Sequence, residues 1–249
     1  MFNLQRVIVE GCQDGVVTQD LISVSRWDKM PTITTVDQYD GQASIQINAT
    51  QLGAEYSARA SAKIVDDWVA FFTAGATAVQ EISFASRTPK RLFDSLRSQT
   101  QLISLLVKWG DYVDLSVLTG MSNLRALVLN GASNVESVEP LCELSSLELL
   151  HIDSLRRVSD LSAIGALSSV SDLSIGGDWM NPRNAHIRSI AFLKEMPQLR
   201  HLVLHTVIVD DQDYSPLLCL PNLQNVRAMA TRGMSPTIDE LKALLPWSG

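Results

Sequence analysis

The feature that most constrains this chain is a six-residue pattern, L-x-x-L-x-L, that recurs through most of its length. The matches are VQEISF from Val79, LISLLV from Leu102, LRALVL from Leu124, LELLHI from Leu147, VSDLSI from Val170, LRHLVL from Leu199 and LQNVRA from Leu223. Their start-to-start spacings are 23, 22, 23, 23, 29 and 24 residues. A fixed period of this size indicates a repeat architecture in which one small structural unit stacks on the next.

Each match fits one short strand. Its fourth and sixth side chains share a face because alternate residues of a strand point to the same side, and its first residue anchors the incoming turn. Since the strands recur at a nearly constant spacing, we expect them to lie parallel, with the return segments on the opposite side. The return segments are short and rich in Ser, Gly and Pro, which favours single helical turns and 3-10 pieces. The return-segment residues expected to point into the core are Val138, Leu141, Leu144, Leu161, Ile164 and Leu167.

These residues resemble the leucine-rich-repeat family, in particular its class of about 22 residues per repeat, to which a regulatory subunit of protein phosphatase 1 and the bacterial internalins belong. The resemblance covers residues 79 to about 235. It implies an α/β solenoid: a curved right-handed coil with a parallel concave sheet and short helical or 3-10 turns on its convex side. The family usually has Asn three residues after the sixth repeat position, where its amide bonds the backbone of the turn. That position holds Gly110, Ala132, Leu155, Asp178, Val207 and Thr231 here, so the turns must satisfy their backbone groups in another way.

A solenoid exposes its core at both ends and needs caps. We therefore divide the chain into an N-terminal cap or diverged repeats with a capping helix (1–75), the repeats (76–234) and a C-terminal capping helix (235–249). Ser235-Pro236-Thr237 followed by IDELKALL predicts a capped helix, and residues 53–75 predict a second helix that ends at Gly75. The apolar face of the first is Ile238, Leu241, Leu244 and Leu245; that of the second is Ala60, Ile64, Trp68, Phe71 and Phe72.

The first fifty residues contain four strand-like stretches, LQRVIVE, DLISVSRW, TITTVDQY and ASIQINA. Two arrangements fit them. They form a small antiparallel sheet packed on the first repeat, or LQRVIV and ASIQIN are diverged long repeats, since Leu4, Gln42 and Val79 are spaced by 38 and 37 residues. The spacing favours the second arrangement for those two strands and leaves the middle two as an insertion.

Composition narrows the function. The 249 residues carry a net charge of −7, which gives no electrostatic support for binding nucleic acid or an anionic membrane and favours a neutral or basic partner. The cysteines Cys12, Cys142 and Cys219 are odd in number and far apart, which favours free thiols in a reducing compartment. The chain shows no signal peptide or transmembrane stretch. We therefore expect a soluble cytoplasmic protein.

The third, fifth and seventh residues of each repeat are expected to face out of the concave sheet and to bind a partner protein. Because this face mixes aliphatic and polar side chains, it has the makeup of a protein-binding surface. Trp109 at the sheet edge and Trp179 in the longer fifth repeat (GGDWMNPRNAH, with Arg183) are possible aromatic anchors; for both, packing into a neighbouring turn is the other interpretation. The candidate partner-binding residues are Leu106, Lys108, Trp109, Val128, Asn130, Leu149, His151, Asp153, Asp172, Trp179, His201, Val203, His205 and Arg227.

Three of the histidines, His151, His201 and His205, share this face with Asp153 and Asp172. Because neighbouring strands are about 4.8 Å apart, we expect these groups to come within a few ångströms of each other, as a metal site or a catalytic base requires. However, His201 and His205 are separated by roughly 13 Å along one strand and cannot hold one ion together. We expect no metal, no cofactor and no catalytic residue, and interpret the cluster as part of a recognition surface. No enzyme motif such as G-x-S-x-G or H-E-x-x-H occurs in the sequence.

The sequence therefore favours a non-catalytic protein-binding module. A stand-alone acidic chain of this kind is typical of a bacterial immunity or antitoxin-type inhibitor, or of an adaptor. Two alternatives remain open: a secreted or injected effector whose leucine-rich repeats target it, and a metal-dependent hydrolase that uses the His/Asp cluster.

Overall fold

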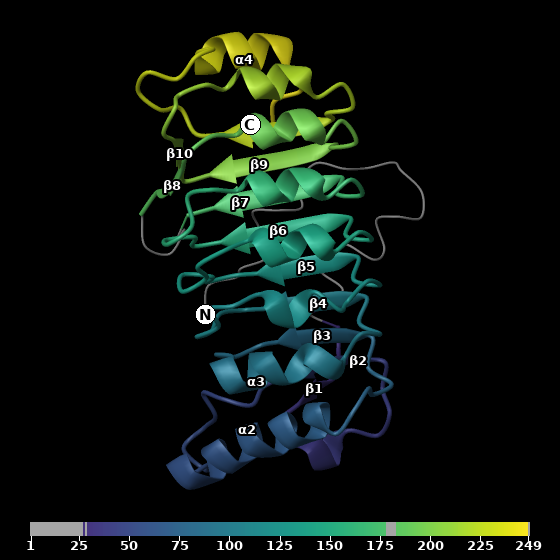
Figure 1. Cartoon of the computed structure of the whole chain (residues 1–249). Helices are drawn as coiled ribbons and strands as arrows, with labels where there is room; N and C mark the ends of the chain where they lie inside the picture. Colours follow the sequence, from purple (N-terminus) through teal and green to yellow (C-terminus); the bar gives the residue numbers. More distant parts are fainter. Residues whose placement is uncertain (1–26, 28, 178–182, 249) are drawn as a thin grey trace.

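A computed structural model describes Trp27, residues 29–177 and residues 183–248. Its main feature is a nine-stranded sheet in which every pair of neighbouring strands is parallel (Figure 1). The strands follow one another in chain order apart from β8 and β10, which lie outside the sheet. They are β1 (Thr32–Ile33), β2 (Ser44–Ile47), β3 (Glu81–Phe84), β4 (Ser104–Val107), β5 (Ala126–Leu129), β6 (Leu149–Asp153), β7 (Asp172–Gly176), β9 (His201–His205) and β11 (Asn225–Ala228).

The seven repeats stack in the register that their sequences predict. Residues at the fourth position pair from strand to strand, in the series Ile82, Leu105, Leu127, Leu150, Leu173, Leu202 and Val226. All of these side chains are buried in one continuous core. The parallel solenoid predicted from the repeat is confirmed.

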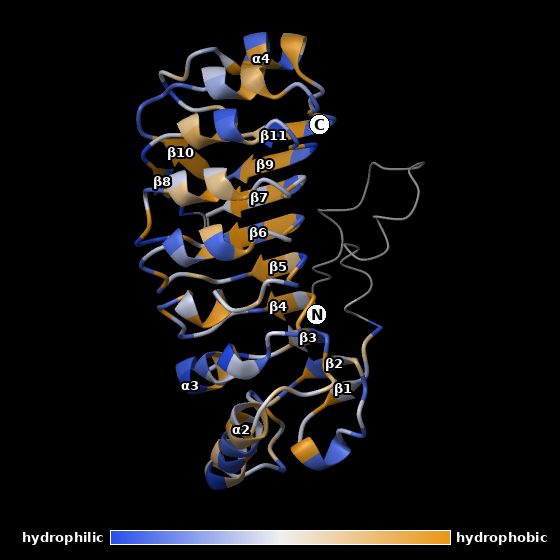
Figure 2. Ribbon diagram, turned by 45° about the vertical axis from the view of Figure 1, so that its right-hand side comes forward, coloured by the Kyte–Doolittle hydropathy of each residue, from blue (hydrophilic) through white to orange (hydrophobic). Residues whose placement is uncertain are grey.

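The return segments form short helices on the opposite side of the core (Figure 2). Those after β4 are 3-10 helices: η4 (Ser116–Leu118), η5 (Glu139–Glu143), η6 (Ser162–Ala166), η7 (Ala191–Glu195) and η8 (Ser215–Cys219). The helical part of the first return segment is longer and forms α3 (Lys90–Asp94) and η3 (Ser95–Ser98). The six residues expected to point inward from this side, Val138 to Leu167, are all buried. The prediction of 3-10 turns is therefore confirmed.

Several turns without the family's asparagine bond to the backbone of a neighbouring repeat. Ala132 N donates to Asp153 O (2.9 Å), Ser154 N to Gly176 O (2.9 Å) and Gly177 N to His205 O (3.1 Å). Near the last repeats these contacts extend into a second two-stranded parallel sheet, made of β8 (Ala185–Ile187) and β10 (Val207–Val209). Backbone hydrogen bonds between repeats thus satisfy turn groups that the asparagine side chain satisfies in other members of the family.

The N-terminal part continues the same sheet. β2, which lies within the predicted strand ASIQINA, pairs in parallel with β3, and the spacing argument for this strand is supported. The expectation that TITTVDQY is an insertion is wrong for its first residues, because Thr32 and Ile33 pair in parallel with β2; Val36–Gln38 follow as the 3-10 helix η2. The stretch LQRVIVE, and DLISVSRW up to Arg26, lie outside the described residues.

The predicted N-terminal capping helix is α2 (Ala58–Thr73). It begins at Ser57, whose side chain accepts a hydrogen bond from Ala60 N, as helix N-caps commonly do. Trp68 is fully buried, and its indole donates to the Thr34 carbonyl oxygen at 2.8 Å. The ring of Trp68 also stacks on Phe72. The helix therefore closes the N-terminal end of the core.

The C-terminal cap is α4 (Ile238–Leu244), with a capping box between Thr237 and Glu240. Leu241 is buried, but Leu244 is 67% exposed, so its place on the apolar face is a wrong prediction. Residues 238, 241 and 245 lie one turn apart along one side of the helix, whereas residue 244 is rotated away from that line. After α4 the chain crosses the free edge of β11, where Val226 N donates to Pro246 O and Ser248 N to Val226 O (both 3.0 Å). No helix in the described part of the chain is long and apolar enough to cross a membrane.

Candidate functional site

The concave side of the sheet divides into two regions. We call the concave surface of β3 to β6 the covered half, because Glu81, Ser83, Ser104, Ala126, Val128, Leu149 and His151 are all buried there. We call that of β7, β9 and β11 the open half, because Asp172, His201, Val203, His205 and Asn225 are partly exposed and Arg227 is exposed, although Ser174 next to the covered half is buried. Because both halves share the L-x-x-L-x-L pattern, this difference points to contacts from outside the repeats.

Two residues that precede the sheet account for part of the cover. Trp27 and Met30 form a second apolar cluster with Ala126, Val128 and Leu149, separate from the main core. Leu106 packs against this cluster. The indole Nε1 of Trp27 donates to Ser104 Oγ at 3.2 Å, and the Gln46 side-chain amide donates to the Trp27 carbonyl oxygen at 3.3 Å. The chain therefore folds back over its own concave sheet.

This contact corrects part of the sequence analysis. The side assignment is confirmed for Val128 and Leu149, which lie outside the main core on the far face of the sheet. Their expected exposure is wrong: Val128 is 5% exposed and Leu149 1%. His151 is likewise buried. Leu106 and Asn130 are half-buried and Lys108 is exposed. Their role in binding a partner stays a prediction.

The acidic and histidine side chains meet where the two halves join. His151 Nε2 on β6 lies 2.9 Å from Asp172 Oδ1 on β7. His205 Nε2 on β9 lies 3.5 Å from Asp153 Oδ1 on β6, although β7 runs between these two strands. The prediction that these groups come within a few ångströms of each other is confirmed.

Gly176 explains how His205 reaches Asp153. It pairs with Asp153 on one side and with His205 on the other. A Cβ atom at this position would lie 2.1 Å from His205 Cε1 and 2.5 Å from Asp153 Oδ1. The missing side chain therefore leaves the space through which the two groups meet over the middle strand.

A buried phenol lies near this junction. Tyr112 stacks on Phe93, with ring centroids 4.6 Å apart, and its hydroxyl donates to the Asn130 carbonyl oxygen at 3.2 Å. Burial raises the pKa of Tyr112 far above its usual value, and the negative charge of Asp153 raises the pKa further. The hydroxyl therefore stays protonated and supports the turn after β5.

No group of three or more His, Cys, Asp and Glu in the described part of the chain is placed to hold a metal ion. His201 pairs in register with Asp172 but belongs to the same strand as His205. The four side chains at the junction thus form two separate His–Asp contacts. This arrangement fixes the direction of both imidazoles, of which His205 is partly exposed and His151 is buried.

Trp109 lies at the edge of the sheet beyond β4 and is 37% exposed. The Arg87 guanidinium lies over its ring, with Cζ 5.9 Å from the ring centroid, and also pairs with Asp111. The Trp109 side chain packs closely on Gly131, where a Cβ atom would lie 2.8 Å from the Trp109 Cβ. Trp109 thus packs on a neighbouring turn and is also partly exposed, and its role as a binding anchor stays a prediction. Arg87 was not among the candidate residues predicted from the sequence. It lies three residues after Phe84, the sixth position of the first repeat, where the family usually has asparagine.

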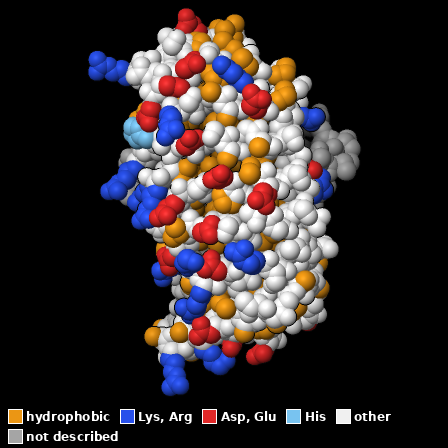
Figure 3. Space-filling view, viewed as in Figure 1, with side chains coloured by type: hydrophobic (Ala, Val, Ile, Leu, Met, Phe, Trp, Pro, Cys, Tyr) orange, Lys and Arg blue, Asp and Glu red, His pale blue; other side chains and the backbone are white. Residues whose placement is uncertain are grey.

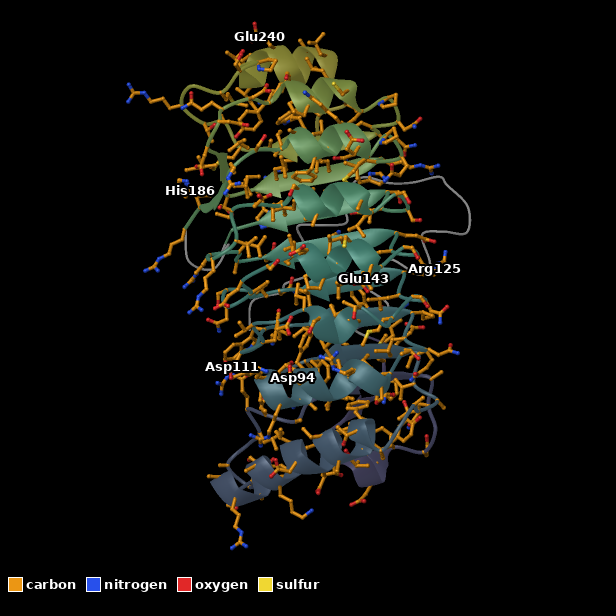
Figure 4. The ribbon with its side chains drawn as sticks, in the orientation of Figure 1. Asp94, Asp111, Arg125, Glu143, His186 and Glu240 are labelled. Atoms are coloured by element: carbon orange, nitrogen blue, oxygen red, sulfur yellow. The ribbon has the colours of Figure 1, made fainter. Side chains whose placement is uncertain are left out.

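The remaining sequence-based candidates are spread differently. Trp179 lies outside the described residues, whereas Arg183 is exposed. Trp27 and Met30 were not among the candidates, because no repeat pattern includes them and only their size and apolar character mark them. Exposed His186 on β8 contacts Asp210 at 2.8 Å, at the edge opposite Arg125 (Figure 4).

A polar groove of about 620 Å³ runs along the edge of the sheet where the strands begin. Its lining includes Gln80, Gln101, Arg125, Glu148 and Ser169. Arg125 and Glu148 already pair across it at 2.6 Å. The groove is polar and open, unlike the largely apolar clefts that bind small molecules. The concave sheet is therefore the stronger candidate.

Comparison with known proteins gives the fold. No protein-family model matches the sequence, and no curated protein matches it. Among solved structures, an internalin (InlF) from Listeria monocytogenes superposes with a TM-score of 0.57 at 18% identity, over 82% of this chain and 52% of that one. This chain thus spans about half the length of that protein.

Two further solved structures match less well. Internalin C2 from the same species gives a TM-score of 0.49 at 19% identity, over 68% of this chain and 69% of that one. The ectodomain of the Arabidopsis thaliana receptor kinase GASSHO1/SCHENGEN3, in complex with Casparian strip integrity factor 2, gives 0.45 at 17% identity, over 59% of this chain and 18% of that one.

Proposed function

We propose that this leucine-rich-repeat protein binds another protein on its concave sheet and performs no catalysis. The fold is typically used for protein binding, through extended concave surfaces. The observation that carries the proposal is the open half, where each of three strands keeps concave side chains at least partly exposed, among them Asp172, Val203 and Arg227.

The chemistry of the open half suits a protein partner. Val203 offers a half-buried aliphatic group between the polar side chains of His201 and His205. Arg227, exposed at the far end, is a residue type enriched at binding hot spots. The His205 imidazole is already oriented by Asp153, so less side-chain freedom is lost when a partner binds.

The partner is neutral or basic. The chain carries a net charge of −7, which slows the approach of acidic proteins and favours basic ones. The convex face shows acidic and basic side chains interspersed rather than one charged patch (Figure 3). The net charge of the whole molecule therefore affects the approach of a partner, and the concave side chains provide the specificity of the contact.

We place this activity in the bacterial cytoplasm, as an immunity or antitoxin-type inhibitor or as an adaptor. Two cysteines, Cys142 and Cys219, are exposed free thiols, which suits a reducing compartment. An inhibitor needs no chemistry of its own, since occupying the partner's surface is sufficient.

The test is affinity capture from the cells that express the protein, with two variants of equal charge change. Arg227→Glu alters the open half, and Lys194→Glu makes the same change at an exposed site on η7 of the convex side. We expect Arg227→Glu to reduce recovery of the bound protein at least about tenfold, a loss of about 1.4 kcal/mol, and Lys194→Glu to leave it unchanged. Equal recovery with both variants, or no protein recovered by a folded bait, would refute the proposal.

A further inference from the structure

The cover on the concave sheet has the geometry of a bound peptide. Trp27 and Met30 are three residues apart on one turn, in which Met30 N donates to Trp27 O at 3.3 Å. Both side chains are buried, with 3% and 7% exposed, whereas Lys29 between them is exposed. The turn therefore presents two apolar side chains to the sheet and a charge to solvent, as a docked helical ligand does.

The surface that receives them is composed like a binding site. Leu106, Ala126, Val128 and Leu149, from three successive strands, supply an apolar floor. Ser104 supplies one hydroxyl that accepts the indole N–H of Trp27. This floor belongs to the far face of the sheet, separate from the main core that holds the solenoid together. The repeats therefore form a core without it, and its exposed form would be an apolar patch of the kind that binds proteins.

We propose that Trp27 and Met30 are an intramolecular ligand of the covered half, and that the partner carries an aromatic and an aliphatic side chain one helical turn apart that replace them there. This inference rests on the proposed function and deepens it. The covered half is then a second part of the partner surface, continuous with the open half across the His–Asp contacts at β6 and β7.

The replacement has a physical basis in competition. A tethered segment competes at a high effective concentration, in the millimolar range for short linkers, so a partner must also engage the open half to displace it. A partner that contacts only the apolar floor beneath Trp27 would bind weakly. The intramolecular ligand therefore selects for partners that use both halves.

The test uses the full chain and a synthetic peptide of residues 25–33, which contains both anchors. The protein variant Trp27→Ala/Met30→Ala vacates the floor, and Lys29→Ala is the matched control, since it changes an exposed residue of the same turn. Calorimetric titration should give the double variant at least tenfold tighter peptide binding than wild type or Lys29→Ala. A peptide with alanine in place of both anchors should bind none of the three.

Adding Val128→Asp to the double variant should abolish binding, because a carboxylate then lies in the apolar floor. Equal binding of the peptide by wild type and double variant, or no binding by a folded double variant, would overturn the inference. If the double variant does not fold, as circular dichroism will show, Met30→Ala alone takes its place with the same expected direction. None of these outcomes depends on a captured partner, so loss of the proposed function and loss of this inference are distinguishable.

Discussion

The two halves of the concave sheet are built from the same repeat and differ in what lies over them. Val128 on β5 and Val203 on β9 occupy the same position in their repeats. Val128 is buried beneath Trp27 and Met30, whereas Val203 is half-buried at an open surface. A repeat pattern thus determines which way a side chain points but not whether solvent reaches it.

The difference also separates two roles of apolar residues on one face. In the covered half, they bind a segment of the same chain and contribute to stability. In the open half, Val203 is half-buried, and we expect it to contribute less to stability. Since the two halves share a backbone, identical substitutions in each can measure the cover directly.

The largest contrast is expected from Val128→Asp and Val203→Asp. The first places a carboxylate in an apolar site that is 5% exposed, and we expect a loss of about 3 kcal/mol or more in the free energy of unfolding. The second places it where solvent reaches, and we expect less than about 1 kcal/mol. Urea denaturation of both variants measures the two losses.

If Val128→Asp and Val203→Asp lower the free energy of unfolding equally, Trp27 and Met30 do not exclude water from Val128, and the two halves do not differ as proposed. The baseline for the comparison is Val128→Ala with Val203→Ala, which removes the aliphatic groups without adding charge. We expect the alanine pair to differ in the same direction and by a smaller amount.

A smaller difference in stability is expected between alanine substitutions at Gly176, under the His205–Asp153 contact, and at Gly177, in the turn that follows β7. At Gly177 an added Cβ would lie 2.5 Å from the Arg183 carbonyl oxygen and 2.7 Å from that of Thr206, and neither backbone can move easily. Gly177→Ala should therefore cost about 2 kcal/mol by overpacking. At Gly176 the close atoms are the ends of the His205 and Asp153 side chains, which can rotate, so we expect a loss of at most about 1 kcal/mol.

Thermal unfolding gives the two stabilities, and the imidazole resonances of His205 give the local effect. We expect Gly176→Ala to shift those resonances, because it separates the ring from Asp153, and to do so even though it is the milder change. Unshifted resonances in Gly176→Ala would mean that the glycine is not what allows the contact over β7.

The sequence predicted the repeats well because their information is local and periodic. The strand positions and their parallel order follow from apolar spacing, and the 3-10 turns follow from short return segments rich in Ser, Gly and Pro. The buried Leu127 and Leu150 lie where the repeat pattern predicts. The cover could not be predicted, because Trp27 belongs to no repeat and contacts Ser104, which is 77 residues away. The His205–Asp153 contact was foreseen only as proximity. Its dependence on Gly176 needs the register of three strands together.

On the convex side, the two halves share a feature: an aspartate that caps the turn at the start of a 3-10 helix. Asp114, behind the covered half, and Asp213, behind the open half, each accept hydrogen bonds from the serine two residues later. The bonds from Ser116 lower the pKa of Asp114, and those from Ser215 lower the pKa of Asp213. Two other repeats have serine in this place: the Ser137 hydroxyl accepts from Glu139 N, and the Ser189 hydroxyl from Ala191 N (both 3.1 Å).

The smallest contrast is therefore Asp114→Ser against Asp213→Ser, each of which keeps a cap that does not titrate. Because the folded pKa of each aspartate is lowered, its contribution is complete above the unfolded value of about 3.9 and disappears as the pH falls through the folded pKa. Each variant should then lose less stability than wild type between pH 6 and pH 3. Both side chains are exposed, so the effect is a few tenths of a kcal/mol. The shift of the urea midpoint between pH 6 and pH 3 should be the same in the two variants. Equal shifts would mean that the two halves differ on the concave side and not on the convex side. An acid response altered by one substitution and not by the other would show instead that the cover acts through the sheet to the turns behind it.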